Sequence, residues 1–123
     1  MTHDRKRMMD AAKNPISALD YEVAQEIASA LGRLGRALES ALAALTAFDE
    51  RNKATADEAA VAAERRELVA RAGHALWQFT VQRESCGLRD TRQMLREYRV
   101  PAEVQRRMGM LAPEAGRIAR PHS

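Results

Sequence analysis

The sequence predicts an all-α protein: two long antiparallel helices that form a hairpin, followed by two short helices. Three observations support this class. Apolar residues recur every three or four positions, capping residues precede the expected helices, and no segment has the alternation of a strand. At 123 residues the chain is short enough for one domain, expected over residues 16–110. A flexible arm is expected over residues 1–15, and a flexible tail over residues 111–123.

The first helix is expected to run from Ser17 to about Arg51, because Ser17 and Asp20 form a capping pair. Apolar residues three or four positions apart lie on one face of a helix. The flanking positions are also apolar or small, so this face is too wide for one partner helix and fits the interior of a bundle. The stripe consists of Ala24, Ile27, Leu31, Leu34, Leu38, Ala41, Leu45 and Phe48.

The first helix is also expected to mediate self-association. A chain rich in alanine and poor in aromatic residues buries little area per residue, and a second copy is a common way to deepen such a core. Two hairpins placed together would complete a four-helix bundle. The sequence therefore predicts a homodimer with an interface at Ile27, Leu31, Leu34, Leu38 and Leu45.

The second helix is expected to begin at a capping box formed by Thr55 and Glu58 and to continue to about Cys86. Gly87 should stop it, since glycine readily takes the left-handed conformation that ends many helices. A short polar loop joins the two long helices, which we expect to be equal in length and antiparallel.

Two short helices are expected after the hairpin. Asp90 and Gln93 form the capping box of the first, and Pro101 opens the second. The second should end at Gly109 after about two turns. Because Trp77 lies off the main apolar stripe, these short helices are the natural elements to cover it.

The sequence does not predict an enzyme. Cys86 is the first candidate nucleophile, but His74 lies twelve residues before it, roughly 18 Å along a helix and out of reach. The other histidines, His3 and His122, lie near the termini, so no metal-ligand cluster is evident. No phosphate-binding loop or hydrolase motif is present. We therefore expect no cofactor, no metal and no small-molecule substrate.

The expected location is the cytoplasm, by elimination. One cysteine fits a reducing compartment. No apolar run approaches the roughly 20 residues of a membrane span, and the charged N-terminus is unlike a secretory signal.

The C-terminal part of the chain is basic. Residues 87–123 contain eight arginines and four acids, within a formal net charge of +3 for the whole chain. Two short helices with a tight turn could imitate a DNA-binding helix-turn-helix, although Arg99 stands where that turn usually has glycine. The alternative is that they cap one end of the hairpin and expose their arginines to solvent.

Two function classes remain. The favoured one is a non-enzymatic, homo-oligomeric structural or protein-interaction module, with an unknown protein as a further partner. The other is a small nucleic-acid-binding or regulatory protein that uses the arginine-rich C-terminal helices. The candidate partner surface consists of Trp77, Gln82, Arg83, Arg96, Arg99, Arg106 and Arg107.

Several segments carry a family resemblance. Residues 77–90 (WQFTVQRESCGLRD), followed by residues 98–101 (YRVP) and 107–109 (RMG), resemble a family of small, uncharacterised helical proteins from proteobacteria. Residues 19–22 (LDYE) and 31–33 (LGR) are also similar, so the resemblance spans most of residues 16–110. Since that family has no assigned activity, the resemblance implies a helical domain of unknown function and transfers no functional residue.

Overall fold

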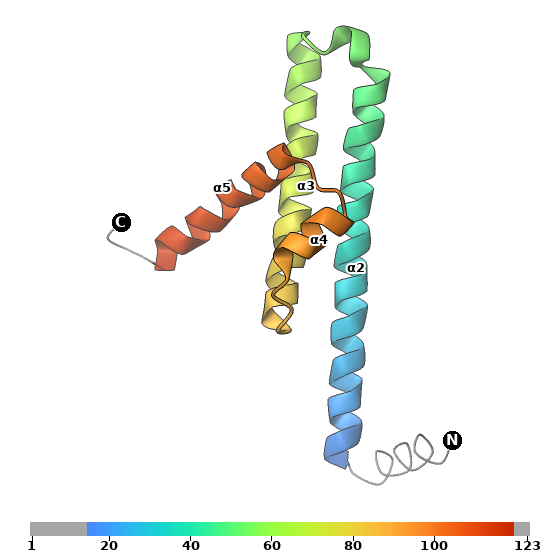
Figure 1. Ribbon diagram of the computed structural model, residues 1–123, viewed down its shortest axis with the longest axis vertical. Coiled ribbons are helices and arrows are strands. Elements are labelled where there is room, and N and C mark those ends of the chain that lie inside the picture. The colour runs from blue at the N-terminus through green and yellow to red at the C-terminus, as the bar shows by residue number, and fades with distance from the viewer. Residues whose placement is uncertain (1–14, 120–123) are drawn as a thin grey trace. The chain divides into compact units, whose positions relative to one another are not determined.

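The computed structural model describes the backbone of residues 15–119 and the side chains of residues 17–110 (Figure 1). The all-α prediction is confirmed, because residues 15–119 contain helices and no strand. The predicted flexible arm falls almost entirely on residues 1–14, outside the described residues; of the predicted tail, residues 120–123 also lie outside them, whereas residues 111–119 are helical. The elements are α2 (Pro15–Arg51), the 3-10 helix η1 (Lys53–Thr55), α3 (Ala59–Ser85), α4 (Thr91–Glu97) and α5 (Ala102–Ala119).

The chain divides into two compact units, residues 1–32 and 33–123, and the boundary falls within α2. In the second unit, residues 33–51 of α2 run antiparallel to α3 (Figure 1). Leu38 and Leu45 are buried there at 0% and 2% exposure. The chain's own core therefore already covers two of the residues that the sequence predicts at an interface between copies.

The N-terminal segment of α2, residues 17–32, has no buried side chain. Leu19 and Val23 are 60% and 51% exposed, while Ile27 and Leu31 are half-buried. The expectation of equal helices is wrong, since α2 has 37 residues and α3 has 27. One continuous stripe in the sequence thus contains a buried part and an uncovered part.

The loop between α2 and α3 differs from the predicted capping box. Thr55 ends η1, and its hydroxyl lies 3.5 Å from the carbonyl oxygen of Asn52. Asn52 in turn donates its side-chain amide to the carbonyl oxygen of Phe48 at 2.9 Å. Glu58 occupies the N-cap of α3 without a side-chain cap bond. The hydroxyl of Thr55 therefore closes the loop and does not start the helix.

The predicted end of α3 at Gly87 is confirmed. Gly87 has φ 87°, in the left-handed region, directly after the C-cap residue Cys86. The backbone N–H of Leu88 donates to the carbonyl of Arg83 at 2.9 Å, and that of Gly87 to the carbonyl of Glu84 at 3.0 Å. This bonding pattern is the Schellman motif, which satisfies carbonyls that a helix end leaves free.

Helix α4 begins as the capping box predicts, since the N–H of Gln93 donates to Oδ1 of Asp90 at 3.2 Å. It ends in a second Schellman motif, with the N–H of Val100 bonded to the carbonyl of Leu95 at 3.0 Å. The left-handed residue here is Arg99, with φ 53°. A non-glycine residue in this conformation carries backbone strain.

Close packing places α4 on the hairpin. Met94 is 1% exposed, and Tyr98 meets the ring of Phe79 edge-on at 5.4 Å between centroids. A Cβ added at Gly35 would lie 2.7 Å from the hydroxyl oxygen of Tyr98. Glycine at position 35 therefore allows the side chain of Tyr98 to approach α2 closely.

Helix α5 is longer than predicted. It passes through Gly109 and continues to Ala119, so the expected stop after two turns is wrong. Gly109 is tolerated inside the helix at a cost of about 1 kcal/mol relative to alanine. The first half of α5 packs on α3, with Val104 fully buried, and the helix then diverges from α3 (Figure 1).

No helix within the described residues is long and apolar enough to cross a membrane.

Candidate interaction surface

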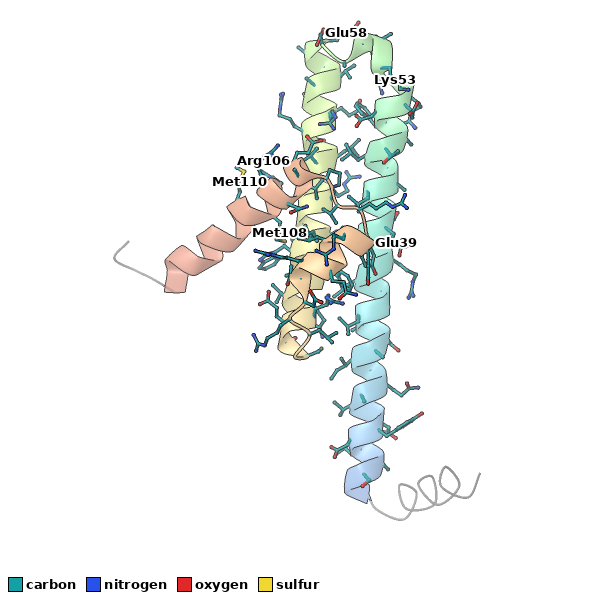
Figure 2. All side chains as sticks on the ribbon, viewed as in Figure 1. Glu39, Lys53, Glu58, Arg106, Met108 and Met110 are labelled. Carbon is teal, nitrogen blue, oxygen red and sulfur yellow. The ribbon has the colours of Figure 1, made fainter. Side chains whose placement is uncertain are left out.

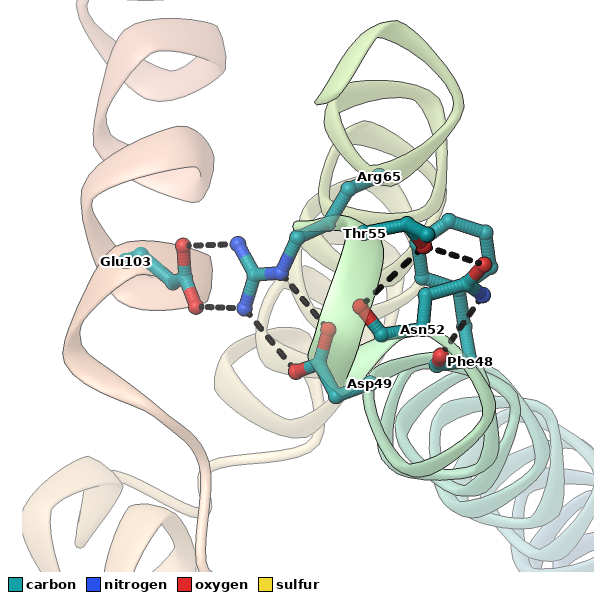
Figure 3. A network of polar contacts seen from close by, with 6 residues as sticks. All are labelled: Phe48, Asp49, Asn52, Thr55, Arg65 and Glu103. Atoms are coloured by element: carbon teal, nitrogen blue, oxygen red, sulfur yellow. Dashed lines mark hydrogen bonds and ion pairs between the residues drawn. The ribbon is translucent and has the colours of Figure 1, made fainter. Parts of the chain in front are cut away.

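An arginine joins three helices near the start of α5 (Figure 3). Arg65 on α3 donates to both carboxylate oxygens of Asp49 on α2, from Nε at 2.8 Å and from Nη2 at 3.1 Å. It donates to both oxygens of Glu103 on α5, from Nη1 at 2.8 Å and from Nη2 at 2.6 Å. All three guanidinium nitrogens are used. We call Asp49, Arg65 and Glu103 the three-helix clamp.

The clamp holds its three groups in their charged forms. The hydrogen bonds from Arg65 lower the pKa of Asp49 and of Glu103 below their usual values. The bonds to Glu103 and Asp49 raise the pKa of Arg65. Because these side chains remain 33–44% exposed, water screens the attraction. Ionised carboxylates bound to an arginine are poor proton donors, so the clamp positions α5 and offers no acid-base chemistry.

A close contact fixes α5 farther along α3. A Cβ added at Gly73 would lie 2.7 Å from Cγ of Arg107 and 3.3 Å from the backbone nitrogen of Met108. The hydroxyl of Thr80 donates to the sulfur of Met108 at 3.7 Å. Glycine at position 73 therefore allows the backbones of α3 and α5 to approach each other.

The clamp and this contact leave a hollow of about 790 Å³ between α3 and the first half of α5, which we call the α3/α5 groove. Its apolar lining includes Val69 and Ala70 from α3 and Met110 from α5, and Met110 is 61% exposed. Arg66 and Arg106 also line the groove, and both side chains are exposed. Figure 2 shows Arg106 and Met110 on the first half of α5.

Arg107 adds an unsatisfied donor to the groove. Its side chain lines the groove and is half-buried. Its Nε is buried and has no hydrogen-bond partner among the described residues. A buried charged donor without a partner is costly, so this nitrogen favours a ligand that brings an acceptor.

Of the predicted partner surface, Arg106 and Arg107 line the groove, whereas Trp77, Gln82 and Arg83 make local contacts at the end of α3. Trp77 is half-buried and stacks on His74 with ring centroids 6.1 Å apart. The amide of Gln82 donates to the sulfur of Cys86 at 3.8 Å. The guanidinium carbon of Arg83 lies 5.6 Å from the centre of the Phe79 ring.

The remaining two predicted residues lie on another part of the surface. Arg96 on α4 and Arg99 in the following turn are exposed and do not line the groove. Sequence reasoning missed Arg66, which lies in a run of alternating charges that is typical of a solvated helix face. It also missed the clamp, because Arg65 and Glu103 are 38 positions apart and neither stands out from its neighbours.

Cys86 is half-buried at the C-cap of α3. Within residues 17–110, no group of three histidine, cysteine or acidic side chains lies together as a metal site.

Comparison with known proteins gives one match. Residues 7–116 match a family of unknown function, DUF6665. No curated protein matches the chain, and no solved structure matches it. The resemblance to a family of unknown function is therefore confirmed over most of the chain.

Proposed function

The chain belongs to this family of unknown function, and we propose that it is a non-enzymatic interaction module that associates with a second copy of itself. The observation that carries the proposal is the uncovered apolar stripe on the N-terminal segment of α2. Leu19, Val23, Ile27 and Leu31 follow helical spacing, yet none is buried. Their continuation at Leu38 is fully buried. An apolar stripe of this length in water favours a partner.

Burial of this stripe in a dimer would supply an energy of the same order as the cost of association. Fully burying one valine or leucine side chain contributes about 1.5–3 kcal/mol. Covering the exposed parts of the four stripe residues in each of two copies would supply on the order of 10 kcal/mol. The sum is below that for full burial because Ile27 and Leu31 are already half-buried. Association costs about 4–15 kcal/mol in lost freedom, so burial of the stripe offsets this cost only at its lower end, and the charged groups beside the stripe would have to add to it.

The test is absolute mass by light scattering after size exclusion, at low micromolar concentration. We expect the wild type at twice 13.7 kDa and Val23→Arg at 13.7 kDa. Tyr21→Arg is the matched control, because Tyr21 is 65% exposed and lies on the opposite side of the helix. It should leave the dimer intact. A wild type that is monomeric throughout this range would reject the proposal.

A substitution at the buried part of the stripe should behave differently. Leu38→Arg places a charge inside the chain's own core and should unfold the protein. Circular dichroism separates the two effects, because Val23→Arg should retain the helical signal and Leu38→Arg should lose it.

Nucleic-acid binding is a second candidate with one observation in its favour. Helices α4 and α5 are joined by a tight turn, and Arg92, Arg96 and Arg99 are exposed there. Against it, the acidic Glu103 occupies the first turn of α5, where a recognition helix usually contacts bases. The test is duplex DNA binding against salt concentration, and no binding at about 50 mM salt would reject this candidate.

A further inference from the structure

We propose that the α3/α5 groove binds the N-terminal segment of α2 from a second copy of the chain. This inference rests on the proposed self-association and names the surface that the uncovered stripe contacts. It commits to one occupant, an acidic amphipathic helix that the chain itself supplies.

The chemistry of the occupant is defined by its sequence. Residues 15–32 contain three acids and no lysine or arginine. Asp20 follows Leu19 and Glu22 precedes Val23, so these two carboxylates lie on opposite sides of the row that Leu19 and Val23 form. The segment therefore presents an apolar stripe flanked by negative charge on both sides.

The groove has the complementary pattern. Its small and apolar lining includes Ala62, Val69 and Ala70, and small residues allow a helix to approach at close distance. Exposed arginines stand on both walls, Arg66 from α3 and Arg106 from α5, and they outnumber the one exposed acid of the described lining, Glu67. Opposite charges beside an apolar contact fix the orientation of a docked helix and exclude other partners.

The clamp and Arg107 strengthen the case for an acidic occupant. Glu103, which also lines the groove, is already bonded to Arg65 at both oxygens and so does not neutralise the other arginines strongly. The buried Nε of Arg107 lacks an acceptor among the described residues. A carboxylate from the docked helix would supply one.

Pairing of two α2 segments with each other is less favourable. Residues 15–32 carry a net negative charge, so two of these segments placed side by side would repel each other. The basic residues that follow, Arg33 and Arg36, belong to the part of α2 that runs antiparallel to α3 in its own chain. The arginines of the groove remove this repulsion.

Reciprocal docking explains why association would stop at a dimer. If each copy inserts its segment into the groove of the other, both stripes and both grooves are used in one two-fold assembly. One-way docking would leave a free segment and a free groove and would produce longer chains.

The experiment uses charge reversal on each side of the proposed contact. The groove variant carries Arg66→Glu and Arg106→Glu, and the segment variant carries Asp20→Arg and Glu22→Arg. All four positions are exposed and lie outside the clamp, so the helical signal should not change. Each variant alone then places like charges in the contact. We expect both to lose the dimer and to have a mass of 13.7 kDa at low micromolar concentration.

Mixing the two variants is the decisive step. In a 1:1 mixture, the acidic segment of one variant meets the arginine groove of the other, and the reversed pair meets in the second contact. We expect the mixture to recover a mass of twice 13.7 kDa. A matched control, Arg92→Glu with Arg96→Glu, makes the same charge change on exposed positions of α4 and should remain dimeric.

The outcomes separate this inference from the proposed function. If the groove variant is still a dimer while Val23→Arg is a monomer, self-association stands and the groove is not its surface. If both variants lose the dimer and the mixture does not recover it, the pairing of segment with groove is wrong. If the wild type is monomeric, both the proposed function and the inference fail.

Discussion

Arg65 on α3 and Glu103 on α5 form an ion pair with two parallel hydrogen bonds, at 2.8 and 2.6 Å, across 38 positions of the chain. Together with the bonds from Arg65 to Asp49, this pair fixes where α5 begins on the hairpin. The width of the α3/α5 groove depends on that position, because both walls come from helices that the clamp joins.

The first prediction concerns the strength of this pair. Glu103→Gln removes one charge and weakens two charge-assisted bonds, but the groups are about one-third exposed and screened by water. We expect the free energy of unfolding in urea to fall by about 1 kcal/mol. Glu50→Gln is the control, since its ion pair with Lys53 is 65–73% exposed and should contribute almost nothing. Equal effects of the two substitutions would show that the clamp is no stronger than a surface pair.

The second prediction is a loss of stability in acid. Bonds from Arg65 hold the pKa of Asp49 and of Glu103 below the usual values of 3.8 and 4.5. A carboxyl with a lower pKa when folded stabilises the fold above its unfolded pKa, and that contribution disappears as the pH falls through the folded value. The free energy of unfolding should therefore decrease from about pH 5 downward. The control is Arg65→Met, which should show a shallower decrease. An identical pH dependence in wild type and Arg65→Met would remove the clamp as its cause.

Local signals in the sequence predicted several features of the fold. The three-and-four spacing predicted α2, and Gly87 predicted the end of α3 because the left-handed cap depends on one residue. The capping box at Asp90 also formed, since the side chain needs only a backbone N–H three positions away. Each signal depends on contacts within a few residues.

Features that depend on distant contacts could not be predicted in this way. The apolar pattern of α2 is the same before and after residue 33. Whether a residue of this pattern is buried depends on the helices that pack against it, so the sequence alone does not distinguish the buried Leu38 from the exposed Val23. Gly109 looks like a stop signal, yet α5 continues through it. Arg65 is one of several arginines in α3, and nothing local marks it as the partner of Glu103.

The third prediction compares two helical glycines. Gly73→Ala would place a Cβ 2.7 Å from Cγ of Arg107 and 3.3 Å from a backbone nitrogen of α5, so the helices must separate. We expect a loss of about 1–3 kcal/mol in the free energy of unfolding. Gly109→Ala is the control, because no described atom beyond its own stretch of helix lies within 4 Å of its added Cβ and alanine favours a helix. It should gain up to about 1 kcal/mol. Stabilisation by both substitutions would mean that α3 and α5 are not in close contact.

The fourth prediction tests the strained turn between α4 and α5. Arg99 has φ 53°, where a residue with a Cβ is strained by about 1 kcal/mol relative to glycine. Arg99→Gly should therefore raise the free energy of unfolding by about that amount, less the entropy that glycine adds to the unfolded chain. Arg99→Ala removes the same charge but keeps the Cβ, so it should bring no gain. Urea denaturation of the two variants separates backbone strain from charge, and an equal gain in both would assign the effect to the arginine charge.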